Sequence, residues 1–199
     1  AGRFGCSLLS IGATQRAGID LLGQAWEVME ERSEQFGNVA DRRQWRLVTM
    51  MHLAETREQA ALDVEYGLAD YARYFREVAA LPLFPDAPIE TIIETLKGSG
   101  TAVIGTPDDA IELIQHLIDE SNGGFGTILL QAHEWANPQA TKRSYELFSQ
   151  YVLPHFDAHA ASTTSSMEWV MSNRSEQLGA AMNAIGAPHP APRGREGGS

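Results

Sequence analysis

Residues Trp45 to Ala60 read WRLVTMMHLAETREQA, and this stretch decides the fold class. Its first nine residues, Trp45 to Leu53, are mostly apolar and have the length of a buried strand. Thr56 and Gln59 follow at the spacing of a capping box, in which two side chains satisfy free backbone N–H groups at a helix start. The pattern predicts a strand followed directly by a helix that extends to about Ala79.

The same alternation occurs on both sides of this unit. Two further apolar runs, Cys6–Ile11 and Phe125–Ala132, predict buried strands, and two amphipathic segments, Ile19–Phe36 and Ala140–Val152, predict helices. Strands that alternate with helices indicate an α/β protein with a parallel sheet. An open doubly wound sheet and a (β/α)8 barrel both fit the pattern, although three units are too few to close a barrel.

The segment Leu81–Gly100 interrupts the alternation. Its first eight residues, LPLFPDAP, contain three prolines and are therefore expected to lack regular structure. The next ten, IETIIETLKG, predict a short helix that ends at Gly98. We interpret the whole segment as a long excursion of the kind that often covers a site.

A strong helix start follows at Gly105, where the sequence reads GTPDDAIELIQHL. Thr106 is a favourable N-cap and Pro107 occupies the first helical position, where its missing N–H has no cost. Asp108 and Asp109 fall in the first turn, where carboxylates interact favourably with the positive end of the helix dipole. We interpret them as capping charges rather than as an acid/base pair or a phosphate cradle, because two carboxylates would repel an anion.

Composition restricts the partners and the compartment. The 199 residues carry a net charge of −11, which argues against a nucleic-acid backbone or an anionic membrane surface as partner. No apolar run approaches the roughly 20 residues needed to span a bilayer. The single cysteine, Cys6, rules out an internal disulfide, so a cytoplasmic setting is the simplest interpretation. Its place in a predicted strand suggests a small core residue.

The two ends of the chain differ from its middle. The opening AGRFGCSLLSIG has no initiator methionine and runs straight into an apolar segment, so we expect the sequence to start inside a domain. Residues 1–156 contain the strand–helix units, and residues 157–186 are expected to form a C-terminal helical extension. Residues 187–199 are rich in proline and glycine, which predicts a disordered tail.

Four stretches carry a resemblance to a known family. They read AGRFGCSLLSIGAT, WRLVTMMHLAETREQA, VIGTPDDAIELIQHLIDESNGGFGTILLQAHEWA and SYELFSQYVLPHF. Together they resemble the C-terminal half of the bacterial-luciferase-like, flavin-dependent monooxygenases. The resemblance covers residues 1–156, and the later MEWVMSNR and GAAMNAIGA are similar to the limonene-type branch.

This resemblance implies the C-terminal portion of a (β/α)8 TIM barrel, with about three βα units followed by a helical tail. Cys6–Ile11, Trp45–Leu53 and Thr127–Gln131 would be strands six, seven and eight, and residues 81–104 would be the long insertion before the last strand. The helix of residues 105–122 would pack beside the barrel just before strand eight.

Ligands of such barrels bind at the C-terminal ends of the strands. The resemblance implies that Ser10, Ile11 and Gly12 end strand six beside the reduced flavin; the alternative is a buried strand end with a glycine turn. His52, near the end of strand seven, could hydrogen-bond a flavin oxygen or act as an acid or base. The alternative for His52 is a core histidine with satisfied hydrogen bonds.

Two more places at strand ends carry polar side chains. His133, Glu134 and Trp135 follow strand eight and could line a pocket or form an ordinary loop. No third ligand stands at zinc-like spacing, so no metal is expected there. Glu55 is expected to be a loop residue at a helix start. The resemblance implies that the flavin phosphate is held largely by other parts of the family's barrel.

The activity implied by the resemblance is a monooxygenation. The complete enzyme would take reduced FMN from a separate flavin reductase and use O2 to oxygenate a small apolar substrate, and it would be a homodimer. Two alternatives remain: a deazaflavin- or flavin-dependent dehydrogenase or reductase of the same fold, and a catalytically incomplete half-barrel.

Overall fold

The computed structural model describes residues 1–11, 13, 16–19, 21–79 and 84–156. They belong to one compact unit, Ala1–Phe156. The predicted helical extension and tail, residues 157–199, lie outside the described residues.

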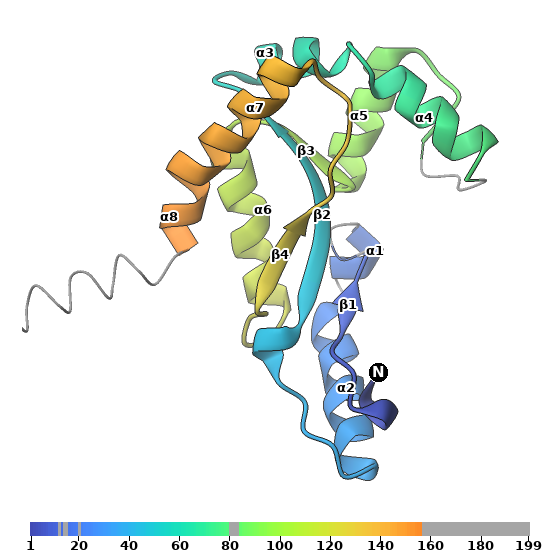
Figure 1. Ribbon diagram of the computed structural model, residues 1–199, viewed down its shortest axis with the longest axis vertical. Helices are drawn as coiled ribbons and strands as arrows, with labels where there is room; N and C mark the ends of the chain where they lie inside the picture. Colours follow the sequence, from blue (N-terminus) through green and yellow to red (C-terminus); the bar gives the residue numbers. More distant parts are fainter. Residues whose placement is uncertain (12, 14–15, 20, 80–83, 157–199) are drawn as a thin grey trace, which may run out of the picture. The chain divides into compact units, whose positions relative to one another are not determined.

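A parallel sheet organises this unit (Figure 1). Its strands are β1 (Leu9–Ser10), β2 (Arg46–Leu53), β3 (Ala102–Gly105) and β4 (Thr127–Leu130). β2 pairs in parallel with each of the other three: Arg46 lies opposite Leu9 of β1 and Thr127 of β4, and Met50 lies opposite Ala102 of β3. β2 is therefore the central strand of the described sheet.

Backbone hydrogen bonds show which strands share an edge of β2. Successive residues of a strand direct their backbone groups to opposite edges. The N–H groups of Arg46 and Ala54 donate toward β1 and β3, over 3.0 and 2.9 Å. The carbonyl groups of Trp45 and Thr49 accept from the β4 segment, over 3.2 and 2.8 Å. β3 therefore continues along the edge of β2 on which β1 ends, and β4 occupies the other edge.

β3 corrects the prediction for residues 81–104. This segment contains helix α5 (Ile89–Ser99) and then a strand whose four residues, Ala102–Gly105, are all buried. A strand of four residues is shorter than the apolar runs by which the other strands were predicted. Gly100, with a φ of 71°, ends α5 and turns the chain directly into β3.

The remaining helices largely follow the predicted segments. Thr56 caps α3 by accepting from Gln59 N, and a break at Gly67 divides the predicted helix of residues 56–79 in two. The helices are α1 (Arg16–Ile19), α2 (Leu22–Gln35), α3 (Arg57–Val64), α4 (Leu68–Glu77), α6 (Pro107–Glu120), α7 (Pro138–Leu147) and α8 (Leu153–Phe156), with a π-helical turn, Phe148–Val152, between the last two.

The first strand is shorter than predicted. β1 starts at Leu9 instead of Cys6, and the Cys6 side chain is exposed. The prediction of Cys6 as a core residue is therefore wrong, because the chain before β1 forms a 3-10 turn, Gly2–Phe4, ahead of the sheet.

The two faces of the sheet have different surroundings. Side chains alternate between faces along a strand, and paired residues of neighbouring strands share a face. The helix face packs against α2, α6 and α7, and carries Leu47, Met51, Leu53, Val103, Ile128 and Leu130. The other face, called here the open face, carries Leu9, Val48, Met50, His52, Ala102, Ile104 and Leu129.

Among the described residues, helices cover one end of the open face and leave the other uncovered. Met50, Ala102 and Ile104 pack in one core with residues of α3, α4 and α5. Beside the amino-terminal half of β2, Leu9 (opposite Arg46) is 51% exposed and Leu129 (opposite Val48) is 38% exposed. The carboxyl end of the open face is therefore buried under α3–α5, and its amino end presents apolar side chains to solvent.

The N-terminus of α6 has the capping arrangement that the sequence predicts. Asp109 accepts hydrogen bonds from the N–H and the hydroxyl of Thr106, at 2.8 and 3.0 Å. Arg57 from the first turn of α3 donates to both Asp109 oxygens, at 2.6 to 3.1 Å. Asp109 is thus a capping residue that also joins the starts of two helices.

Replacement of Asp109 with Asn should lower the free energy of unfolding at neutral pH by about 1 kcal/mol, the usual worth of a helix cap. Arg57 and Thr106 hold the pKa of Asp109 below its usual value, against an opposing effect of burial. Because the pKa of Asp109 is lower in the folded chain, its ionised carboxylate stabilises the fold at pH values above the unfolded pKa of about 3.9. This stabilisation is lost as the pH falls through the folded-state pKa. The difference between the two proteins should therefore shrink below about pH 4.

Urea unfolding at neutral pH and at about pH 3 measures this effect. Asp108→Asn is the matched control, because exposed Asp108 in the same turn makes no side-chain hydrogen bond to the described residues. If both variants lost the same free energy of unfolding at neutral pH, the negative charge near the start of α6 would be the cause, and the hydrogen bonds of Asp109 would contribute nothing.

Candidate functional site

The carboxyl ends of β2 and β4 bring together the polar side chains of His52, Gln131 and His133. His52 lies on the open face of β2 and is fully buried. Its Nε2 is 3.1 Å from Oδ2 of Asp63 on α3, and the other oxygen of Asp63 accepts from Gln59 Nε2 at 2.7 Å. The Nδ1 atom of His52 is buried and has no hydrogen-bond partner among the described residues.

His133 lies close to this pair. Its Nε2 is 2.9 Å from the carbonyl oxygen of Met51, and its ring stacks on Trp135 with centroids 3.9 Å apart and planes inclined by 18°. Burial is the main cause that lowers the pKa of His133, and the neighbouring His52 lowers it further. Its Nδ1 is also buried without a partner among the described residues.

The loop after β4 is packed inward at alternate positions. Trp135 is fully buried, whereas Glu134 is exposed. A pocket of about 530 Å³ borders this loop and the start of α7, and is lined by Tyr66, His133, Glu134, Ala136, Pro138, Thr141, Lys142 and Tyr145.

Aromatic residues of α4 complete the cover of this end. The Tyr71 hydroxyl is 3.2 Å from Gln131 Nε2, and its ring packs edge-on against Phe84 and Trp135 at 5.7 Å. Burial raises the pKa of Tyr71. α3 and α4 therefore contact β2 and the loop after β4 through two polar pairs, from Asp63 to His52 and from Tyr71 to Gln131.

The three residues predicted to bind flavin lie at the end of β1. The Ser10 hydroxyl accepts the indole N–H of Trp45 at 3.0 Å. Ile11 is 71% exposed, and Gly12 lies outside the described residues. Glu55, predicted as a loop residue, is exposed and accepts from Arg143 at 2.7 Å, and this hydrogen bond lowers its pKa.

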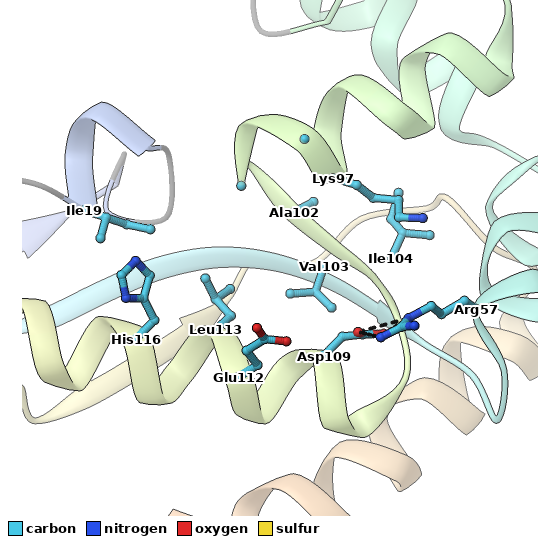
Figure 2. Close-up of a pocket in the computed structure, with 12 residues that line it drawn as sticks. Ile19, Arg57, Lys97, Ala102, Val103, Ile104, Asp109, Glu112, Leu113 and His116 are labelled. Atoms are coloured by element: carbon cyan, nitrogen blue, oxygen red, sulfur yellow. Dashed lines mark hydrogen bonds and ion pairs between the residues drawn. The ribbon is translucent and has the colours of Figure 1, made fainter.

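A larger pocket of about 680 Å³ lies along β3, between α5 and α6 (Figure 2). Lys97, Ala102, Ile104, Glu112 and His116 contribute to its lining. The ion pair of Arg57 and Asp109 also borders it. Sequence reasoning missed this pocket because it depends on β3.

The same reasoning missed Asp63, Tyr71 and Gln131. Asp63 had one available signal, its position four residues after Gln59, which places both on one side of α3. Tyr71 and Gln131 are 60 positions apart in the sequence, so no local pattern relates them. Within the described part of the chain, no three His, Cys, Asp or Glu side chains are grouped to hold a metal ion. No helix in this part is both long and apolar enough to cross a membrane.

No family model matches the chain, but several proteins are similar to it. It is 38% identical over 177 residues to limonene 1,2-monooxygenase of Rhodococcus erythropolis. The aligned region covers 88% of this chain and 45% of that protein. The chain is 30% identical over 184 residues to 4-hydroxyprotoasukamycin monooxygenase of Streptomyces nodosus subsp. asukaensis, covering 91% and 49%.

A solved structure supports the same relationship. The oxygenating constituent of 3,6-diketocamphane monooxygenase of Pseudomonas putida, a type II Baeyer-Villiger monooxygenase in complex with FMN, matches 77% of this chain and 44% of its own. The TM-score is 0.54 and the sequence identity 25%. The chain belongs to the luciferase-like family of flavin-dependent monooxygenases. It spans about half the length of the curated relatives it matches.

Proposed function

We propose that these residues form the C-terminal part of a (β/α)8 barrel whose complete form is an FMN-dependent monooxygenase. The observation that carries the proposal is the open sheet. Within the described residues, β1, β3 and β4 pair only with β2, and helices cover the helix face along β2. The open face, apolar and partly exposed, corresponds to the interior of a barrel, which further strands would close.

The site then lies at the carboxyl ends of the strands, on the open face. Ile11, Gly12 and the backbone of Ser10 would border the flavin ring at the end of strand six, since the Ser10 side chain pairs with Leu47 on the helix face. The residues present offer two features that suit such a group: a buried His52 nitrogen without a partner among the described residues, at the carboxyl end of β2, and the exposed apolar surface of Ile11 at the end of β1. Reduced FMN, when bound, supplies the activation of O2. The part of this chain is to hold the ring and to exclude water through α3–α5.

The relatives suggest the substrate class and the partners. Limonene and a camphane ketone, named in the relatives, are small and apolar, so we propose a small apolar substrate and use limonene as the probe. We also propose a separate flavin reductase as the source of reduced FMN, a homodimeric complete enzyme and a cytoplasmic location. FMN is favoured over a deazaflavin because the solved relative is in complex with FMN.

Anaerobic titration of the complete protein with reduced FMN tests the proposal. We expect saturable binding and, after addition of O2, an oxygenated product from limonene. Binding of a deazaflavin in preference to FMN, or hydride transfer without oxygen incorporation, would replace the monooxygenase with a dehydrogenase of the same fold. A complete protein that binds neither would remove flavin chemistry from the proposal.

The exposed amino end of the open face predicts self-association of the 199-residue chain. Leu129→Glu should weaken this association by about 10-fold or more, since burial of a leucine side chain contributes about 1.5–3 kcal/mol. Sedimentation velocity over a concentration series measures the change. Val39→Glu is the control, because Val39 is 91% exposed and lies between α2 and β2, outside the sheet. Equal effects of the two substitutions would show that the open face is not the associating surface.

A further inference from the structure

The hydrogen bonds around His52 restrict what this residue can offer to a ligand. Ionised Asp63 only accepts hydrogen bonds, so the His52 nitrogen 3.1 Å from it, Nε2, must carry the proton. The second oxygen of Asp63 accepts the amide of Gln59, four residues earlier on α3. A neutral imidazole has one N–H, and here it is directed to Asp63. Its other nitrogen, Nδ1, then carries a lone pair.

This lone pair lies where a ligand is expected. His52 is at the carboxyl end of the central strand, on the open face, and is completely buried. Its Nδ1 has no partner among the described residues, although buried polar atoms in proteins nearly always have one. His133 repeats the arrangement, because its Nε2 donates to the Met51 carbonyl and its Nδ1 is buried without a partner there. Among the described residues, this region thus presents the Nδ1 acceptors of two imidazoles, and both imidazole N–H groups are engaged.

We infer that Asp63 is a positioning residue, which fixes the tautomer of His52 so that Nδ1 accepts a hydrogen bond from an N–H or O–H group of the bound ligand. The inference rests on the proposed function for the identity of the ligand, which is either the reduced flavin or the molecule that reacts beside it. The sequence suggested that His52 could hydrogen-bond a flavin oxygen, for which it would have to donate. In the inferred arrangement His52 accepts a hydrogen bond from the ligand instead. His52 contacts the ligand, and Asp63 acts only through His52.

Asp63→Asn tests the tautomer with little change of shape. Gln59 donates its amide to one oxygen of Asp63, and with Gln59 in this orientation the carbonyl of the new amide turns toward Gln59 and its NH2 group toward His52. Nε2 of His52 must then accept, and the proton moves to Nδ1. The ring keeps its position but presents a donor to the ligand, as in other enzymes where an Asp→Asn change selects the wrong histidine tautomer.

The exchange of the two side chains should restore the arrangement. In the double variant Gln59→Glu with Asp63→Asn, the new carboxylate at position 59 accepts the NH2 group of the amide at position 63. The amide carbonyl then faces His52 and accepts from Nε2. If Asp63 only joined α3 to β2, the single and the double variant should behave alike, because both retain a hydrogen bond between position 63 and His52.

Nitrogen NMR of the complete protein without flavin reads the tautomer directly. We expect a proton on Nε2 of His52 in the wild type, on Nδ1 in Asp63→Asn, and again on Nε2 in the exchanged double variant. A wild-type ring protonated on Nδ1, or on both nitrogens, would overturn the inference. An exchanged double variant protonated on Nδ1 would do the same. This readout needs no bound cofactor.

The affinity for reduced FMN and the turnover number then identify which molecule donates the hydrogen bond to Nδ1 of His52. If the donor belongs to the flavin, Asp63→Asn should weaken the binding of reduced FMN by about 10-fold, the typical worth of one hydrogen bond, and the double variant should recover it. If it belongs to the reacting molecule, FMN affinity should be unchanged, and the turnover number with limonene should fall and recover instead. No change in either quantity would overturn the ligand role. Failure of every variant, wild type included, to bind reduced FMN would remove the proposed function, and the tautomer measurement alone would then decide the role of Asp63.

Discussion

Trp45→Ala should lower the free energy of unfolding by about 3–5 kcal/mol, the range for removal of a buried large side chain without repacking. Trp45 precedes β2 and is fully buried. Its ring stacks on Trp26 of α2 with centroids 5.2 Å apart, and its indole N–H donates to Ser10 of β1. One side chain therefore joins β1, α2 and the start of the central strand.

Arg42 makes this site less able to collapse after the substitution. Its guanidinium lies over the Trp26 ring at 4.8 Å and donates to the carbonyl groups of Ser121 and Gly124. These bonds hold it in place, so it cannot move into the space that Trp45 leaves. Urea unfolding at low protein concentration, followed by circular dichroism, measures the loss.

Trp45→Phe separates packing from the hydrogen bond. It retains an aromatic ring against Trp26 but removes the N–H that Ser10 accepts together with part of the indole ring, so the loss should be smaller than that of Trp45→Ala and should include about 1 kcal/mol for the hydrogen bond. If Trp45→Ala and Trp45→Phe cost the same, the hydrogen bond to β1 would outweigh the ring packing, contrary to this account.

Gly67→Ala should lower the free energy of unfolding by about 3 kcal/mol, at the upper end of the range for overpacking. A Cβ atom at this position would collide with the backbone carbonyl oxygen of Glu134. The Gly67 N–H also donates to the Trp135 carbonyl at 2.8 Å, so the two backbones cannot separate without loss of this bond. The φ of Gly67 is −143°, which alanine tolerates, and the collision is therefore the cause of the effect.

Gly98→Ala is the matched control for Gly67→Ala. Gly98 lies near the end of α5, and a Cβ atom there would meet no atom within 4 Å. The change should stabilise the chain by about 0.5 kcal/mol, because alanine loses less conformational entropy in a helix. Thermal and urea unfolding of both variants, compared with the wild type, provide the measurement. A Gly67→Ala protein as stable as the wild type would show that α4 and the loop after β4 can separate freely.

Local pattern predicted the elements that have strong end signals. The strand predicted for residues 45–53, the N-cap Thr56 and the helix that starts at Pro107 are confirmed, whereas the side chain of Gln59 donates to Asp63 instead of completing a capping box. Each depends on neighbours within about four residues, through strand burial or helix capping. The family also followed from quoted stretches of sequence, because the order of these signals is more specific than any one of them.

Three features could not be predicted in this way. β3 has only four residues, and it becomes recognisable through its pairing with β2. Cys6 has an apolar neighbourhood in the sequence but lies before the sheet begins. The contact of His52 with Asp63 depends on how α3 returns over the open face, and Gln59 then directs the carboxylate.

The linear order of residues thus established an alternating α/β chain and its helix starts, because these follow from short-range backbone and side-chain preferences, and it indicated the family through the resemblance of the quoted stretches. The folded chain decided that β1 and β3 share one edge of β2, which residues of the open face are covered, and which nitrogen of His52 is free. These outcomes depend on contacts between segments distant in sequence, where a shift of one residue in register would move every side chain to the opposite face.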